Sequence, residues 1–169
     1  MRELELNNSS WLILRFTYWL PAISVAVLIS LFSTHSFSSD QTGRVLIPIL
    51  HWLFPGANAH LLHLLHIGIR KLAHVTEFAA LSIAVFYGVR GGCTGWKFNW
   101  AICTLVIAVA YAGLDEWHQS FVPLRDARAR DVAIDAFGAL LAQSLVWAFA
   151  EWKWNFRMTR KPPPDTVLP

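Results

Sequence analysis

The chain has 169 residues, of which 55% are hydrophobic and only 15% are charged. This composition predicts a single domain and argues against a soluble globular protein. The formal net charge of +3 would suit a nucleic-acid binder, but the basic residues lie at the edges of long apolar segments, which is typical of membrane proteins. We therefore expect membrane lipids as partners and no nucleic acid.

Four apolar segments approach the roughly 20 residues that a helix needs to cross the hydrocarbon core of a bilayer. In chain order they cover residues 16–32, 72–89, 98–114 and 132–150. We predict an all-α fold, a polytopic membrane helical bundle with four transmembrane helices. The membrane domain is expected to cover residues 1–157, and the proline-rich tail of residues 158–169 is expected to be disordered.

The long connection between the first two segments, residues 36–60, is interrupted by glycines and prolines. Its apolar stretch at residues 45–54 is too short to cross a membrane, so it should lie in the interface or re-enter part-way. Asn58 is a suitable N-cap for a helix that continues through Val89. Such a helix would be about 48 Å long, so its first part must protrude from the membrane or lie along it.

A stripe of polar side chains follows one face of this predicted helix. At about 100° per residue, five of them fall within an arc of about 80°. They are His63, His66, Arg70, His74 and Glu77, and Lys71 lies beside His74 at the i, i+3 spacing. We expect His60, His63 and His66 to form a solvated interfacial face. Four residues lie deeper, where solvation is not available, and are better candidates for function: His74, Glu77, Asp115 and Asp135.

The same calculation groups polar residues on the last two segments. Tyr111, Asp115, His118 and Gln119 share a face at the end of the third segment, and Asp131, Asp135, Gly138 and Ala142 share a face of the fourth. Ionisable groups at membrane depth cost at least about 2.5 kcal/mol each, so these faces should turn towards one another. Small residues such as Gly138 and Ala142 would let the helices approach closely. We therefore predict a shared polar pocket.

The positions of lysine and arginine predict the orientation in the membrane. Eight lie on one side of the predicted spans: Arg2, Arg15, Arg90, Lys97, Lys153, Arg157, Arg160 and Lys161. Six lie on the other: Arg44, Arg70, Lys71, Arg125, Arg128 and Arg130. Five of these six are close to acids that can pair with them, which leaves a bias of eight to one. Both termini are therefore expected in the cytoplasm.

The charged cluster admits several interpretations. Its six acids, Glu77, Asp115, Glu116, Asp126, Asp131 and Asp135, nearly balance the five nearby bases, so the charges could simply hold the helices together. Alternatively, the i, i+3 pairs His74–Glu77 and Asp115–His118 have a spacing that helices use for metal ligands, although it is common by chance.

A further interpretation is a site for an anionic group. Lys71 and Arg125 could hold a phosphate or carboxylate while His74 and Asp115 act as base and acid. A proton relay is another use of the same groups. We expect Arg125 to bond to Asp115, Glu116 or Asp131, because its loop returns to the mouth of the pocket and an unpaired guanidinium there would be costly. The sequence identifies no cofactor, and it leaves open whether the protein is an enzyme.

Three motifs in order resemble the VanZ-like family of bacterial integral membrane proteins. They are "RKLAHVTEF" with Lys71, His74 and Glu77, "DEWHQSFVPLR" with Asp115, Glu116, Gln119 and Arg125, and "RDVAIDAFGALLA" with Asp131 and Gly138. The motifs lie within residues 70–150. The chain departs from the family pattern twice, since the family usually has asparagine where Asp135 stands and glycine where Leu124 stands.

The resemblance implies a multi-pass protein of the bacterial cell membrane. The member that gives the family its name is associated with resistance to the glycopeptide antibiotic teicoplanin, but no settled reaction comes with the family. We expect a pocket at the outer face that binds or modifies an envelope lipid or its headgroup. The alternative is a non-catalytic scaffold or modulator. The candidate pocket residues are Lys71, His74, Glu77, Asp115, Glu116, Gln119, Arg125 and Asp131.

The predicted orientation can be tested by labelling single cysteines in intact cells. In a chain whose Cys93 and Cys103 are replaced by serine, a cysteine at Gln41 or Ala127 should react with an impermeant probe, and one in the tail should be protected. The reason is the excess of lysine and arginine on the side that holds the termini. The reverse pattern of labelling would mean that the topology is inverted.

Overall fold

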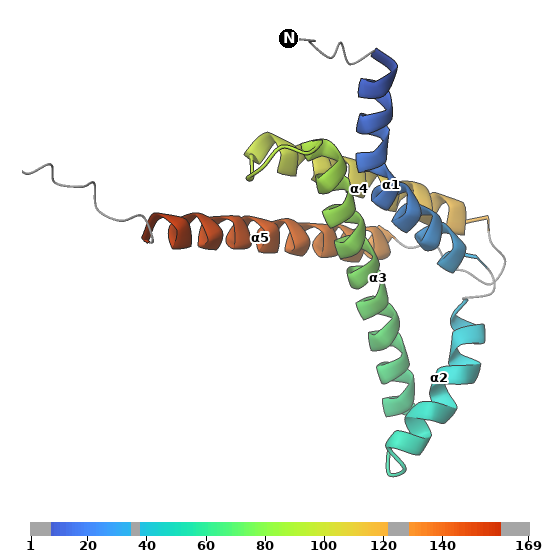
Figure 1. Ribbon diagram of the computed structural model, residues 1–169. Coiled ribbons are helices and arrows are strands. Elements are labelled where there is room, and N and C mark those ends of the chain that lie inside the picture. The colour runs from blue at the N-terminus through green and yellow to red at the C-terminus, as the bar shows by residue number, and fades with distance from the viewer. Residues whose placement is uncertain (1–7, 35–37, 122–128, 160–169) are drawn as a thin grey trace, which may run out of the picture.

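The computed structural model describes residues 8–34, 38–121 and 129–159. Five helices make up this part of the chain: α1 (Asn8–Phe32), α2 (Ser39–Leu53), α3 (Ala59–Arg90), α4 (Phe98–Gln119) and α5 (Ala129–Thr159). The described residues include no β-strand, which confirms the predicted all-α class. α3 is the central helix, because α1, α2, α4 and α5 all pack against it (Figure 1).

Three of the helices are long and apolar enough to cross a membrane: α3, α4, and α5 from Ala129 to Lys153. The apolar stretch Phe16–Phe32 of α1 is shorter, but its 17 residues reach the lower limit for a spanning helix. Large apolar side chains such as Phe16, Val106 and Leu145 are exposed on the outside of the bundle. These exposed side chains are the surface that lipid tails would cover, in agreement with the predicted four-span bundle.

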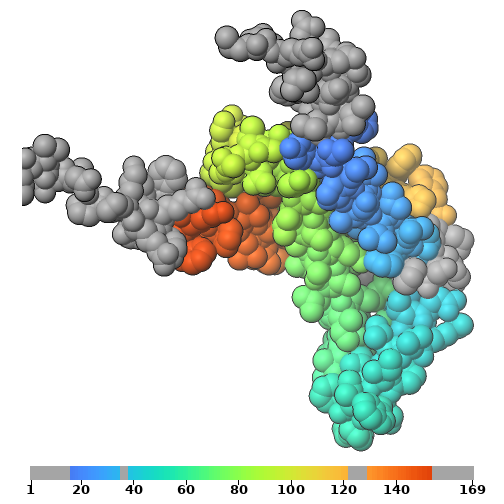
Figure 2. Space-filling view, in the orientation of Figure 1, coloured from blue at the N-terminus to red at the C-terminus, as the bar shows by residue number. Residues whose placement is uncertain are grey.

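The long first connection contains a helix of its own. α2 has 15 residues and includes both Gly43 and Pro48, which the sequence pattern had indicated as breaks. It packs against the first half of α3, and together they form a hairpin that projects from the rest of the bundle (Figures 1 and 2). Gly43 is buried in this contact, where a Cβ would lie 3.3 Å from Cε1 of His66. The glycine therefore allows close packing on the histidine ring.

α3 begins and ends where its capping residues predict. The Asn58 side chain accepts a hydrogen bond from the backbone N–H of Leu61 at 2.8 Å, which confirms Asn58 as the N-cap. The helix ends at Arg90, and Gly91 follows in the left-handed conformation with φ 55°. Its 32 residues give a length of about 48 Å. The apolar second half packs among α1, α4 and α5, and the first half extends into the hairpin.

α3 and α5 touch backbone to backbone where they cross. A Cβ at Gly138 would overlap the carbonyl oxygen of Val75 and lie 2.9 Å from its Cα. Gly138 is followed by Ala139, and Ala142 lies one turn further on; both alanines are almost completely buried. Small residues therefore allow this close crossing, as predicted for Gly138 and Ala142.

Side-chain hydrogen bonds join the helices in the apolar interior. Ser82 of α3 donates to the carbonyl oxygen of Ala139 at 3.1 Å, and the Gln143 amide of α5 donates to the Ser82 hydroxyl at 2.9 Å. The Tyr111 hydroxyl of α4 donates to the carbonyl oxygen of Ala26 in α1 at 2.6 Å. Such interhelical bonds contribute on the order of 1 kcal/mol each in a membrane.

The connections divide the bundle into two ends (Figure 1). At the α1–α2 end, α1 and α4 end while α2 and α5 begin. At the α3–α4 end, α3 ends and α4 begins, and the start of α1 and the end of α5 lie on this same side (Figure 1).

The close crossing of α3 and α5 can be tested by the same glycine-to-alanine substitution at two positions. Gly138→Ala should lower the melting temperature in detergent, because overpacking at a backbone contact costs about 1–3 kcal/mol. Gly113→Ala in α4 is the control, since a Cβ there would meet nothing within 4 Å. It should be neutral or stabilising by up to about 1 kcal/mol, as alanine is the better helix former. Equal melting temperatures for the two variants would contradict the crossing.

Candidate functional site

A cavity of about 250 Å³ lies at the α1–α2 end, where the α2–α3 hairpin joins the bundle. Three segments line it: the end of α1 with Phe32 and Ser33, α2 with Thr42, and α3 with Arg70, Ala73, His74 and Glu77. The three α3 side chains Arg70, His74 and Glu77 belong to the polar stripe that helical periodicity placed on one face. This second part of the stripe, from Arg70 onward, therefore faces a cavity and not lipid.

The central interaction of the site joins His74 of α3 to Asp135 of α5. Nδ1 of His74 lies 3.2 Å from Oδ1 of Asp135, whose side chain is only 2% exposed. His74 itself is 19% exposed and lines the cavity. Because Nδ1 is engaged by the carboxylate, Nε2 is the ring nitrogen left for a ligand or for proton transfer.

Asp135 was outside the set of eight candidate residues taken from the sequence. Its place on the inward face of the last helix, one turn before Gly138, had nevertheless identified it as a residue at membrane depth with a better claim to function. Its surroundings are acidic, since Asp115 and Asp131 both lie within electrostatic range of its carboxylate. His74 in turn is within range of Glu77 and Asp131. The imidazole is thus the shared partner of several carboxylates.

Arg70 brings a positive charge to the cavity and connects it to α2. Its Nη1 donates to the Thr42 hydroxyl at 3.2 Å, and the same hydroxyl lies 3.3 Å from Nε2 of His66. His66 is only 2% exposed, so the prediction that it belongs to a solvated face was wrong. The reason is α2, which covers His66 and whose presence as a packed helix the sequence pattern did not indicate.

Lys71 lies on a different side of α3 from Arg70 and His74. It is not among the residues lining the cavity, and it borders an apolar groove between α3 and α5 instead. Its Nζ is 3.9 Å from Oδ1 of Asp131, with the two side chains 49% and 28% exposed. An ion pair this exposed contributes about 0–1 kcal/mol, so it adds little to the stability of the crossing.

The polar residues at the end of α4 form a buried wall behind the cavity. The Gln119 amide donates to Oδ2 of Asp115 at 2.6 Å and to the hydroxyl of Ser33 at 3.1 Å. All three residues are at most 6% exposed, and the neighbouring Glu116 is 8% exposed. Ser33 is shared by this wall and the cavity, so Gln119 positions one of the groups that a ligand would meet.

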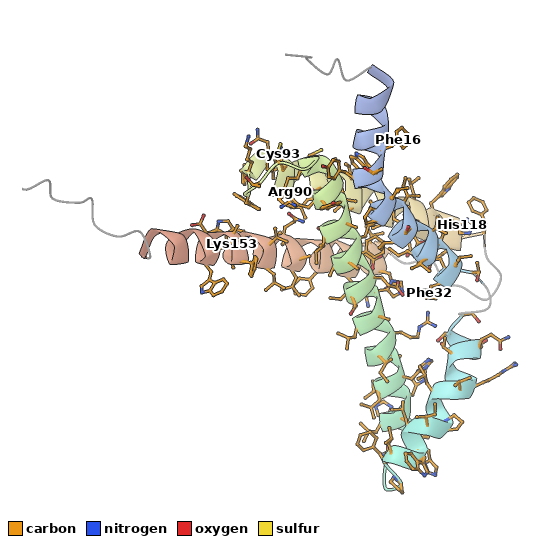
Figure 3. All side chains as sticks on the ribbon, viewed as in Figure 1. Phe16, Phe32, Arg90, Cys93, His118 and Lys153 are labelled. Atoms are coloured by element: carbon orange, nitrogen blue, oxygen red, sulfur yellow. The ribbon has the colours of Figure 1, made fainter. Side chains whose placement is uncertain are left out.

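The interpretation as a metal site and the interpretation as an anion site both depend on residues that are not in this arrangement. His118 is exposed near the end of α4 (Figure 3), although it had been placed on one face with Asp115. Within the described ranges no three His, Cys, Asp or Glu side chains are grouped as metal ligands. Arg125, with its expected pairing to an acid, lies outside the described residues.

Comparison with known proteins gives a family match that includes most of the helices described above. The model of the VanZ/LLP1 family matches residues 12–150. No curated protein and no solved structure shows significant similarity to the chain. The match extends the likeness found in residues 70–150 back through α1 and α2, so it includes the segments that supply Ser33 and Thr42 to the cavity. The chain therefore belongs to the VanZ/LLP1 family of membrane proteins.

Proposed function

We propose that the cavity at the α1–α2 end binds the phosphate-bearing headgroup of an envelope lipid at the outer face of a bacterial cell membrane, and that His74 acts on the bound headgroup. One observation carries this proposal: an imidazole held by a buried carboxylate shares a cavity with an arginine at the end of an apolar helical bundle. A ligand that is polar at one end and apolar at the other suits such a position.

Arg70 and the Ser33 hydroxyl supply the donors that a phosphate needs. A guanidinium presents paired N–H donors that match two oxygens of a phosphate. Arg70 is held by its bond to Thr42, and the hydroxyls of Thr42 and Ser33 line the same cavity. A phosphate there would receive charge-assisted hydrogen bonds from Arg70 and a further bond from the Ser33 hydroxyl, since the Thr42 hydroxyl donates to the carbonyl oxygen of Ser38.

The cavity also contains a negative charge at a distance from Arg70. Glu77 lies seven residues after Arg70, which is about 10 Å further along α3. It already interacts electrostatically with His74. Opposite charges at the two ends of the cavity favour a headgroup that carries both a phosphate and a hydrogen-bond donor, such as a hydroxyl or an ammonium group.

His74 is the group best placed for chemistry. Its Nδ1 contact with Asp135 sets the orientation of the ring, and Nε2 is then the atom that can give or accept a proton. Positioned acid–base groups typically accelerate reactions by about 10²–10⁴-fold. The cavity volume of about 250 Å³ suits a headgroup and not a whole lipid, so the acyl chains would remain in the bilayer.

A second candidate function is a membrane scaffold or modulator whose polar cluster is structural. The observation that favours it is that several polar contacts join helices without lining the cavity. Gln143 bonds to Ser82 between α5 and α3, and Lys71 pairs with Asp131 between α3 and α5. In that case the removal of one buried partner should destabilise the protein, because it leaves an uncompensated buried charge.

The proposal extends to an effect on susceptibility to glycopeptide antibiotics. The support for it is family membership together with the association of the name-giving member with teicoplanin resistance. A protein that binds or modifies an envelope lipid could produce such an effect by changing the composition of the envelope.

The two functions are separated by substitutions that preserve hydrogen bonding. His74→Gln keeps a donor for Asp135 but cannot transfer protons, and Arg70→Gln keeps a donor for Thr42 but removes the charge. Both should abolish the difference in envelope lipid profile between cells with and without the protein, at unchanged membrane abundance and detergent melting temperature. Arg44→Gln is the control, since Arg44 is exposed on α2 and does not line the cavity.

A fall in abundance and melting temperature that parallels the loss of the lipid effect would favour the scaffold. Retention of the lipid effect in both cavity variants would contradict the proposed headgroup site. Teicoplanin susceptibility, measured in the same strains, tests the extension to glycopeptides.

Two substitutions of Asp135 test the other member of the His74–Asp135 pair. Asp135→Asn should be mild in both abundance and lipid effect, because the amide oxygen can still accept a hydrogen bond from Nδ1 of His74. Asp135→Leu removes the acceptor, so the imidazole loses its orientation and the lipid effect should disappear. Quantitative blotting of the membrane fraction gives the abundance. A collapse of Asp135→Asn would show that the negative charge itself is needed for helix packing.

A further inference from the structure

A second polar pocket lies at the opposite end of the bundle from the cavity. It has a volume of about 390 Å³ and is formed by the end of α3, the α3–α4 connection and α5. Its polar lining comes from Arg90, Thr94 and Lys153, and its apolar wall includes Phe86 and Phe149. We call it the Arg90–Lys153 pocket.

The distance along the helices separates this pocket from the proposed headgroup cavity. Arg90 follows His74 by 16 residues on α3, which is about 24 Å. Lys153 follows Asp135 by 18 residues on α5, which is about 27 Å. These lengths are close to the hydrocarbon thickness of a bilayer, about 30 Å, as expected for pockets at opposite membrane surfaces.

The Arg90–Lys153 pocket is in a positively charged region. In the described part of the chain, this end carries Arg90, Lys97 and Lys153 with one nearby acid, Glu151. Figure 3 shows Arg90 at the end of α3 next to α5, on which Lys153 lies. Two cations on different helices therefore border one cavity. They repel each other unless an anion lies between them.

Arg90 is only partly satisfied by the protein. Its guanidinium lies 5.8 Å from the centre of the Tyr87 ring, which is a cation–π contact. Its Nε is buried and has no hydrogen-bond partner among the described residues. Nε is closed to a ligand, so an anion in the pocket would be bound by the remaining N–H groups of the guanidinium.

The helix dipole is the simplest alternative explanation. A cation in the last turn of a helix interacts favourably with the free carbonyl groups there, and Arg90 is the last residue of α3. This accounts for a positive charge at position 90. It does not account for Lys153, which lies on a different helix six residues before its end, or for the open volume between the two side chains.

We propose that the Arg90–Lys153 pocket binds a phosphate group, namely that of an anionic membrane lipid at the second membrane surface. Arg90 would bind two phosphate oxygens, Lys153 would add a point charge, and the Thr94 hydroxyl would donate a further bond. Phe86 and Phe149 would contact the apolar part of the same lipid. Basic pockets between membrane helices are a recurrent site for anionic headgroups. A soluble phosphate compound offers the same chemistry, and the experiment separates the two sources.

The test is native mass spectrometry of the full chain in detergent, titrated with phosphatidylglycerol, phosphatidylcholine or inorganic phosphate. The wild-type protein should bind phosphatidylglycerol more tightly than phosphatidylcholine. Arg90→Gln and Lys153→Gln should each lower the affinity for phosphatidylglycerol about tenfold, as expected for the loss of one bond to a charged group. Because Lys153 is exposed, its variant should fold normally, and the melting temperature checks this.

Lys97→Gln is the matched control. It removes one positive charge at the same end, but Lys97 lies over the Trp100 ring at 4.7 Å and does not line the pocket. Its affinity for phosphatidylglycerol should equal that of the wild-type protein. An unchanged affinity in a folded Lys153→Gln variant, or an equal loss in Lys97→Gln, would overturn the proposal.

Inorganic phosphate distinguishes the sources of the ligand. Binding of phosphate that is lost in the Arg90 and Lys153 variants, without a preference for phosphatidylglycerol, would assign the pocket to a soluble phosphate compound. If neither probe binds to the wild-type protein, the pocket is not a phosphate site. The same titrations in an Arg70→Gln background, where the other cavity has lost its guanidinium, should show the same losses in the Arg90 and Lys153 variants, so the outcome does not depend on the function proposed for that cavity.

Discussion

The backbone contact between Val75 and Gly138 determines how the rest of the site is arranged. His74 precedes Val75 on α3, and Asp135 lies one turn before Gly138 on α5. When the two backbones touch at this point, the imidazole and the carboxylate come within 3.2 Å. A larger residue at position 138 would separate the helices and leave Asp135 buried without its partner, which typically costs about 3–5 kcal/mol. Steric fit and charge pairing therefore reinforce each other at one crossing.

α3 is long enough to serve both ends of the molecule. Its second half is surrounded by α1, α4 and α5, whereas the beginning of its first half packs against α2. The contacts with α2 include polar ones, with Thr42 bonded to both Arg70 and His66. Because Thr42 and Arg70 also line the cavity, the hairpin forms part of the site and is more than a projecting arm. A movement of α2 would change the surroundings of Arg70 directly.

Much of the candidate site follows from helical periodicity, since Arg70, His74 and Glu77 share a face of α3 and meet the same cavity. The same reasoning was less successful near helix ends. His118 was placed with Asp115, but it is three residues further along, near the end of α4, where a side chain can turn to the outside. His66 was expected to be solvated, but it is buried because α2 packs over it. Lys71 is next to Arg70 in sequence and therefore about 100° away around the helix, which directs it to the α3–α5 groove.

The sequence by itself determined the four long helices and the polar faces of α3, α4 and α5. The lengths of the apolar segments predict membrane helices, Asn58 predicts the start of α3, and the spacing of Asp131, Asp135 and Gly138 predicts one inward face of α5. These features are local, because a helix relates each residue to its neighbours by a constant rotation and rise. Only the tertiary structure decided that Asp135 is the partner of His74 and that α2 closes the cavity with Thr42. The physical reason is that the rotation, crossing point and separation of two helices depend on which small residues let their backbones meet, and no spacing within one helix contains that information.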